Sequence, residues 1–331
     1  MRRREFVAFA SAALAAGTTL AQGRERTVRV GFLVHSANLR NPFWKPFFAA
    51  MSRLGWREGV DYSIEIRDAR GDPARALALA RELAAQPVDL IVAISGGAAL
   101  AASKATRRIP VVSWLGYPVE AGLAKSLAHP GGNVTGVANY AGTDVWAKSI
   151  ELLRELRPGL GVLGVLWDYG PPAFPDGHVP IPIIEQAAQR IGIKAHIWTV
   201  RTEEDLKKAL SALERERVEA IIITNGGGIH LQLADKIGET FARLRLPAIV
   251  DVSGTPVFER GRCVLAYGPN VPEILTRLAS FVDRILRGAR PDDLPFELPT
   301  RFDLVVNLPA ARAIDLTVPR SLLLRADRVI E

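Results

Sequence analysis

The same order of strand-like and helix-like segments occurs twice along this chain of 331 residues. Each half contains a strand, a helix, a second strand and helix, a third strand, a glycine-rich turn with a further helix, and a fourth strand introduced by a basic residue, any residue and a proline. The first and third strands begin near residues 28 and 88 in one half and near residues 162 and 218 in the other. Because alternating strands and helices form parallel sheets covered by helices, the sequence predicts two similar Rossmann-like α/β lobes.

Apolar runs mark the strands of both halves. Residues 88–94 and 218–223 are almost continuously apolar, which is typical of parallel strands buried on both faces. Asp72 precedes Pro73 and is the expected N-cap of one helix. We predict helices at residues 43–54, 72–85, 98–106, 142–157, 183–191, 203–216 and 229–244. A lid-like loop is expected where prolines gather, at Pro171, Pro172, Pro175, Pro180 and Pro182.

A glycine-rich segment, residues 129–137, separates the two halves. Glycines and a proline end the first half, and the β-branched pair Val134-Thr135 begins a strand that we expect to be the first crossing between the lobes. Two more strand-like segments, residues 264–270 and 300–308, flank a helix at 271–288 and predict two further crossings, hence a three-strand hinge. The predicted lobes comprise residues 27–134 plus 269–299 and residues 138–265 plus 302–331.

The N-terminus has the pattern of an export signal peptide over residues 1–22. Basic residues precede an apolar stretch that ends in small residues. This stretch lacks the polar face of an amphipathic helix and is too short and alanine-rich to span a membrane, so no stable membrane insertion is expected. Arg3, Arg4 and the following Phe6 also resemble the twin-arginine export motif. The expected location is the periplasm.

Composition narrows the function classes. The formal net charge is +7, but lysine and arginine are scattered outside the N-terminus, so no nucleic-acid partner is expected. The single cysteine, Cys263, excludes an intrachain disulfide framework, an all-cysteine metal site and the two-cysteine racemases. Its apolar neighbours predict a buried strand residue.

Candidate ligand-binding residues follow the strands, because ligands of open α/β sheets bind beyond the carboxyl ends of the strands. Aromatic and short hydrogen-bonding side chains predominate among them, which suits a small polar ligand with a flat or apolar part. The candidates are His35, Ser36, Asn38, Ser95, Gly96, Gly97, Trp114, Tyr117, Asn139, Trp167, Asp168, Asn225, Asp251 and Tyr267.

Several of these residues allow two interpretations. The turns at residues 95–97 and 225–228 present backbone N–H groups that favour an anion such as a carboxylate, but tight turns need glycine in any case. Neither is a dinucleotide fingerprint or a phosphate-binding P-loop. Asp168 either pairs with a ligand ammonium or caps a turn. Trp114 and Trp167 are either core residues or stacking platforms for a ligand.

Catalytic chemistry has little support. There is no GxSxG nucleophile elbow and no HExxH motif among the five histidines. His35 follows the first strand and is a candidate for facing the ligand, whereas the other four histidines are expected at the surface. The sequence therefore predicts a protein that is not an enzyme, with no catalytic residues, no metal site and no cofactor.

Several segments resemble ABC-transporter substrate-binding proteins of the tryptophan/tyrosine-type group. The similarity is carried by residues 108–112, 118–123, 126–136, 151–158, 162–167 and 265–269. It implies the type I periplasmic-binding-protein fold, with a ligand held between two lobes and no catalysis. Two positions depart from the family pattern: Tyr117 stands where aspartate usually precedes Pro-Val, and Asp168 stands where asparagine commonly follows tryptophan.

The resemblance and the residues together predict an exported, monomeric solute-binding protein. It would capture an amino acid or another aromatic or carboxylated compound between its lobes and deliver it to an ABC permease. A periplasmic sensor that presents its ligand to a receptor would use the same site. An exported enzyme on this fold is the third alternative, and turnover of a bound ligand would distinguish it.

Overall fold

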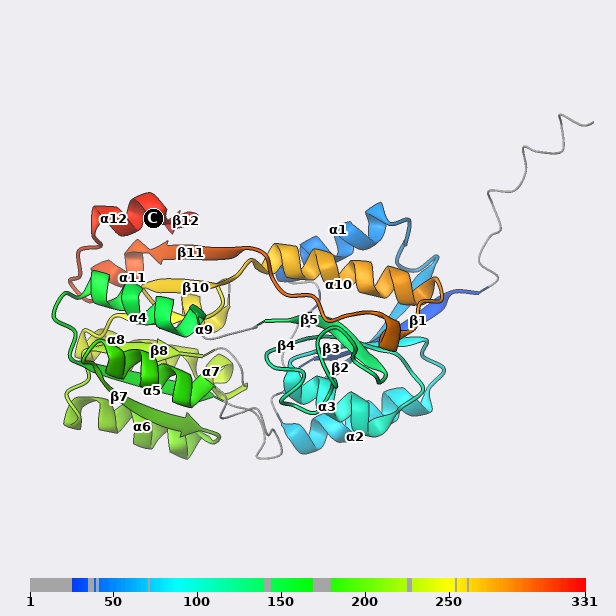
Figure 1. Cartoon of the computed structure of the whole chain (residues 1–331), viewed down its shortest axis with the longest axis horizontal. Coiled ribbons are helices and arrows are strands. Elements are labelled where there is room, and N and C mark those ends of the chain that lie inside the picture. Colours follow the sequence, from blue (N-terminus) through cyan, green and yellow to red (C-terminus); the bar gives the residue numbers. More distant parts are fainter. Residues whose placement is uncertain are drawn as a thin grey trace, which may run out of the picture.

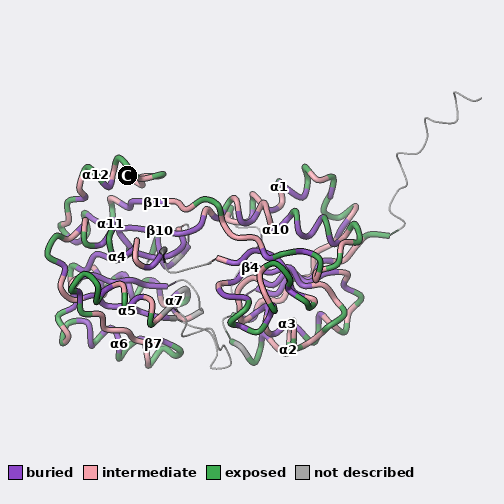
Figure 2. Tube along the Cα trace, in the orientation of Figure 1, coloured by how far each residue is buried: buried purple, intermediate pink, exposed green. Residues whose placement is uncertain are grey.

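The computed structural model describes residues 26–34, 39, 42–70, 72–139, 144–168, 180–224, 228–253, 255–260 and 262–331. Figure 1 shows two lobes side by side, each built around one sheet with helices on both faces. Figure 2 shows that buried residues run through the middle of each lobe and exposed residues line its outer helices. The two α/β lobes predicted from the repeated pattern are confirmed.

The sheet of the first lobe is wholly parallel and has the order β2-β1-β3-β4-β5. Its strands are β1 (Val28–Val34), β2 (Tyr62–Asp68), β3 (Leu90–Ile94), β4 (Val111–Leu115) and β5 (Val134–Ala138). The intervening helices are η1 (Pro42–Trp44), α1 (Lys45–Arg53), α2 (Pro73–Ala85) and α3 (Gly96–Ala105).

The sheet of the second lobe has the order β12-β11-β10-β9-β8-β6-β7, parallel except where β10 meets β11. Its strands are β6 (Val162–Asp168), β7 (Lys194–Val200), β8 (Ala220–Ile223), β9 (Ala248–Val250), β10 (Leu265–Pro269), β11 (Phe302–Asn307) and β12 (Arg328–Ile330). Its helices are α4 (Asp144–Leu156), α5 (Pro180–Arg190), α6 (Glu203–Arg215), α7 (Gly228–Gln232), α8 (Ala234–Leu244), α9 (Pro256–Glu259), α11 (Leu308–Arg312) and α12 (Arg320–Arg325).

The repeat in the sequence corresponds to a repeat in the strand order. Strands β7-β6-β8-β9-β10 of the second sheet follow the same order as β2-β1-β3-β4-β5 of the first. In both sheets the strand order reverses beside the first strand of the repeat, and such a switch point is where open α/β sheets bind ligands. Strands β11 and β12 have no counterpart in the first sheet.

Two sequence-based expectations were wrong in detail, and one strand was missed. The helix expected at residues 229–244 is divided into α7 and α8 because Leu233 leaves the helical conformation, with φ of −108° and ψ of 22°. Pro180 and Pro182 lie in the first turn of α5 rather than in a loop, since the first helical turn needs no proline N–H. Strand β12 was not expected, because its three residues are too short to form a recognisable pattern.

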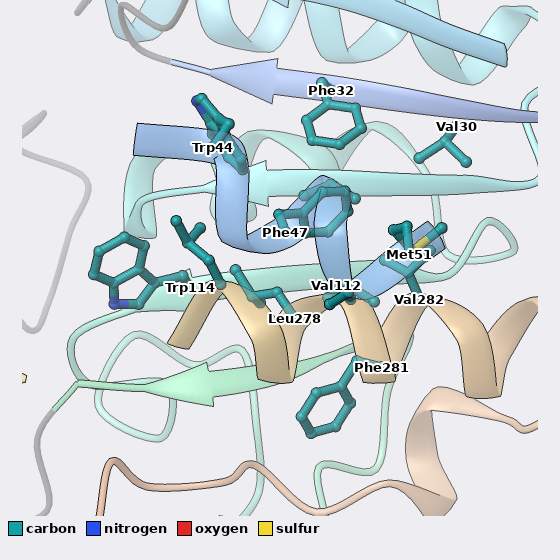
Figure 3. Close-up of a cluster of buried hydrophobic side chains, with 14 of the residues drawn as sticks. Val30, Phe32, Trp44, Phe47, Met51, Val112, Trp114, Leu278, Phe281 and Val282 are labelled. Atoms are coloured by element: carbon teal, nitrogen blue, oxygen red, sulfur yellow. The ribbon is translucent and has the colours of Figure 1, made fainter. Parts of the chain in front are cut away.

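The helix α10 (Val271–Leu286) completes the first lobe although it follows β10 of the second. Its residues Leu278 and Phe281 pack in one cluster with Phe32 of β1 and Phe47 of α1, as Figure 3 shows. The rings of Phe32 and Phe47 meet edge to face, with centroids 5.6 Å apart. This helix therefore fixes the return of the chain to the first lobe by burial of apolar surface.

The chain crosses between the lobes three times, after β5, between β10 and α10, and ahead of β11 (Figure 1). The third crossing is hydrogen-bonded to both of the others. In the first lobe, Glu297 N donates to Gly136 O at 3.0 Å and Ala138 N donates to Glu297 O at 2.9 Å. In the second, Asn270 N donates to Arg301 O at 2.9 Å. The predicted hinge is thus a hydrogen-bonded unit of three chain segments.

Candidate functional site between the lobes

Segments that follow the carboxyl ends of the strands in one lobe contact those of the other. Trp146 Nε1, in the first turn of α4, donates to the Tyr117 hydroxyl just beyond β4 at 3.4 Å. Gln232 Nε2, at the end of α7, donates to the Arg70 carbonyl just beyond β2 at 2.8 Å. Because the two sheets meet at these ends, the switch points of both lobes lie toward the same junction.

In the first lobe, Trp114 is hydrogen-bonded to two other predicted residues. It lies in β4 and is almost completely buried, and its ring stacks on Phe43 at 6.2 Å between centroids with an interplanar angle of 12°. Its Nε1 donates to Asn139 Oδ1, and its carbonyl accepts from Ser95 N at 3.0 Å. Trp114 is therefore a core residue that also orders the two polar candidates beside it.

Ser95 forms the turn between β3 and α3 in a strained conformation. Its φ is +103°, a backbone conformation that residues other than glycine rarely adopt. Such a conformation costs on the order of 1–3 kcal/mol. The hydroxyl caps α3 by accepting from Ala98 N at 3.2 Å. Gly96 and Gly97 follow in the first turn of α3 and are half-buried. The turn thus presents the positive end of a helix dipole at the end of β3.

Aromatic side chains from the two lobes meet at the junction. Trp167 is the next-to-last residue of β6 in the second lobe and is buried against Trp146, with centroids 5.4 Å apart and an interplanar angle of 64°. Trp146 in turn reaches Tyr117 of the first lobe. The sequence reasoning missed Trp146 and Phe43. Their positions in the sequence could have identified them, because each lies near the start of a predicted helix, next to a predicted crossing or strand end.

The second lobe places Asp251 and Tyr267 on neighbouring chain segments. Asp251 directly follows β9 and is largely buried, and Tyr267 lies in β10 with its ring stacked on Phe302 at 6.1 Å. Val252, next to Asp251, belongs to the apolar cluster of the first lobe around Trp114. The segment after β9 therefore contacts both lobes.

Two buried groups of the second lobe bear on chemistry. Cys263 is buried as predicted, although it lies just before β10 rather than within it, and burial together with the charge of Asp251 raises the pKa of its thiol. His230 was expected at the surface, and this was wrong: it is fully buried in α7 with Nδ1 2.8 Å from the Thr224 carbonyl oxygen. Its position in the first turn after β8 points it inward.

Some candidates cannot be placed. His35, Ser36, Asn38 and Asn225 lie outside the described residues, and for Asp168 the structure gives only its backbone position at the end of β6. Over the described ranges, no group of three or more histidine, cysteine, aspartate or glutamate side chains is arranged to hold a metal ion. No helix in those ranges is long and apolar enough to cross a membrane.

Comparisons with known proteins agree on one family. The family described as ABC transporter substrate binding protein matches residues 34–330. The chain is 23% identical to a tyrosine-binding protein of Clostridioides difficile strain R20291 over 296 residues, which cover 88% of this chain and 82% of that protein.

Two solved structures show the same fold. One is an ABC domain from Streptococcus pneumonia in complex with L-Trp, with a TM-score of 0.82 and 21% identity, over 92% of this chain and 100% of that one. The other is a ligand-free, open structure of a substrate binding protein with adhesive properties from Clostridium difficile, with a TM-score of 0.63 and 22% identity, over 92% of this chain and 99% of that one.

Proposed function

The chain belongs to the family of ABC transporter substrate-binding proteins, and from that premise we propose that its ligand is a small molecule that carries both an aromatic ring and a carboxylate. Capture of a solute for an ABC transporter is the function of this family. The proposal concerns which solute is captured and where it binds, namely between the two lobes at the carboxyl ends of the strands.

The observation that carries the proposal is the aromatic contact between the lobes. Tyr117 of the first lobe and Trp146 and Trp167 of the second form a continuous set, so a flat ligand at this junction would touch both lobes at once. The Ser95 turn adds the start of α3, which favours a carboxylate. A ligand that contacts both lobes stabilises their closed arrangement, because the open one offers only half of the contacts.

The relatives support the same ligand class. One relative is named for tyrosine binding and one structural neighbour holds L-Trp. The TM-score is also higher with the L-Trp complex than with the ligand-free, open structure, at matched coverage of this chain. This difference supports an arrangement of the two lobes like that in a ligand-bound structure. An aromatic amino acid is accordingly the first compound to test.

The remaining parts of the proposal concern the cellular setting. Residues 1–22 act as an export signal of the twin-arginine type, and the mature chain works in the periplasm as a monomer that docks to an ABC permease. The protein does not transform its ligand. The burial and raised pKa of the Cys263 thiol support this view, since a thiol acts as a nucleophile only when it is deprotonated and accessible.

Calorimetric titration with L-tryptophan, L-tyrosine and benzoate tests the proposal. At least one should bind with one-to-one stoichiometry, and Ser95→Ala and Tyr117→Ala should each weaken that binding about tenfold, the equivalent of about 1.4 kcal/mol. Ser211→Ala, on the exposed face of α6, is the matched control and should bind normally.

The unfolding midpoint of each variant separates lost contacts from lost folding. Unchanged affinity in both Ser95→Ala and Tyr117→Ala would place the ligand elsewhere. Conversion of a bound compound into a product would favour an enzyme instead.

A further inference from the structure

A hollow lies in the first lobe, away from the junction between the lobes. It has a volume of about 800 Å³, within the range of ligand sites. Its lining includes Pro110, immediately before β4, and Asn133, immediately before β5. These are the amino ends of the strands, whereas the proposed solute site lies at their carboxyl ends. A five-residue strand, roughly 15 Å long, separates the two.

Three segments form this hollow, and hydrogen bonds tie two of them to each other. Asn133 Nδ2 donates to the carbonyl of Thr106 at 3.0 Å and to that of Ile109 at 2.8 Å, which ties the segment before β5 to the loop before β4. Lys125 N donates to Pro130 O at 3.0 Å. The third segment, residues 289–292, follows α10 and enters the short 3-10 helix η3 (Pro291–Asp293); Figure 1 shows α10 running away from the second lobe.

The glycine-rich segment between the two sequence halves builds part of the wall. Gly131 has φ of +67°, and a Cβ there would lie 2.8 Å from Cδ of Lys125. Glycine therefore allows the aliphatic part of Lys125 to lie against the backbone. Together with the two hydrogen bonds of Asn133, this contact shows that the segment holds the hollow's shape as well as connecting the lobes.

The charge of the lining is strongly positive. Arg290 is paired with Asp292, with Nη2 2.6 Å from Oδ2. Arg107, Arg108 and Lys125 are exposed and form no ion pair within the part of the chain that the structure describes. Four cations and one carboxylate thus line the hollow, and Arg290 also lies 3.9 Å from the neighbouring Asp293 carboxylate. Arg107, Arg108 and Lys125 are left as three positive charges without an ion-pair partner among the described residues.

We propose that this hollow binds a polyvalent oxyanion that carries phosphate or several carboxylates. Two arginine guanidinium groups offer the planar pairs of donors that match such oxygens, and lysine adds a third positive charge. Cations that converge on a concave surface reinforce one another's field, which favours a ligand of more than one negative charge. The proposal does not depend on the identity of the solute bound between the lobes.

Titration of the full chain with inorganic pyrophosphate at low salt tests the proposal, with citrate as the polycarboxylate probe. The variant Arg107→Gln/Arg108→Gln/Lys125→Gln should lose at least about tenfold in affinity. The control Arg53→Gln/Arg81→Gln/Lys207→Gln removes the same charge from exposed sites outside the hollow and should bind as the unmodified protein does. Equal affinity in the two variants, or no binding of either probe, would overturn the proposal.

Vesicles separate a free anion from a lipid headgroup. The same proteins are mixed with vesicles of phosphatidylcholine alone or with phosphatidylglycerol. Flotation only with phosphatidylglycerol vesicles, lost in the first variant and kept in the control, would assign the hollow to a phosphate headgroup. Pyrophosphate binding without flotation would assign it to a free polyanion. Flotation that is equal in both variants would contradict a role for the hollow at a membrane.

Discussion

At the scale of single residues, Tyr62 is the clearest case of burial acting on chemistry. It begins β2, is only 2% exposed, and burial raises the pKa of its hydroxyl to about 12, with the nearby Glu58 adding to the shift. The unfolded chain loses this proton near pH 10. The stabilising effect of the neutral hydroxyl is therefore fully present below about pH 10 and is lost as the pH rises toward about 12.

We predict that Tyr62→Phe flattens the alkaline loss of stability. A rise of about two pKa units corresponds to roughly 2–3 kcal/mol that the unmodified protein loses over this range and the variant keeps. Urea unfolding at about pH 9 and about pH 11.5 measures the difference, and all other titrating groups are common to both proteins. Parallel losses in the two proteins would show that Tyr62 is not the group responsible.

Single residues also show where sequence reasoning succeeds. Asp72 caps α2 as predicted, accepting from Ala74 N at 2.8 Å, because an N-cap depends only on its immediate neighbours. Burial of His230 and the stacking of Phe43 on Trp114 depend on contacts between distant segments, which no local pattern contains. The ligand contacts of the candidate residues stay predictions.

At the scale of elements, the two halves share a close approach between strands at the hinge. In β5, a Cβ on Gly136 would lie 2.0 Å from the Ser113 carbonyl oxygen, and φ there is +142°. In β10, the counterpart of β5, a Cβ on Gly268 would lie 1.7 Å from the Asp251 carbonyl oxygen. Both crossings therefore require glycine where the strand packs against its neighbour.

We predict that Gly136→Ala and Gly268→Ala each lower the free energy of unfolding by about 3 kcal/mol or more, because the added methyl overlaps a backbone carbonyl. Gly161→Ala is the matched control, since its Cβ would make only an ordinary contact of 3.7 Å with Glu219 Oε2. Chemical denaturation measures all three. Variants at Gly136 and Gly268 as stable as the control would mean that the strands are not this close in solution.

Elements that repeat were the most predictable part of the fold, since hydrophobic runs and turn residues lie within each strand–helix unit.

The basic hollow in the first lobe was not predictable from the sequence. Its cations lie on three separate segments: the adjacent Arg107 and Arg108 before β4, Lys125 before β5, and Arg290 after α10, and only the fold brings these segments together. Basic residues that are scattered in the sequence are therefore concentrated around one hollow in the folded protein.

At the scale of the whole molecule, the hydrogen-bonded hinge segments favour closure of the lobes as rigid bodies. The contacts across the junction include the hydrogen bonds Trp146–Tyr117 and Gln232–Arg70 and the packing of Val252. Two hydrogen bonds contribute about 1 kcal/mol each. A ligand that touches both lobes can therefore decide whether they are open or closed.

The most direct test of a ligand held between the lobes is the interlobe distance. Dyes attached through Arg81→Cys on α2 and Lys207→Cys on α6 report it, because both positions are exposed and Figure 1 shows these helices along the same edge of the two lobes. The native Cys263 will not compete for label, since it is buried and the pKa of its thiol is raised.

Single-molecule energy transfer is then followed as the tightest-binding aromatic acid of the calorimetric panel is added. We expect a shift to higher transfer efficiency, with a midpoint at the calorimetric dissociation constant. A ligand that binds by calorimetry but leaves the transfer efficiency unchanged would contradict a site between the lobes.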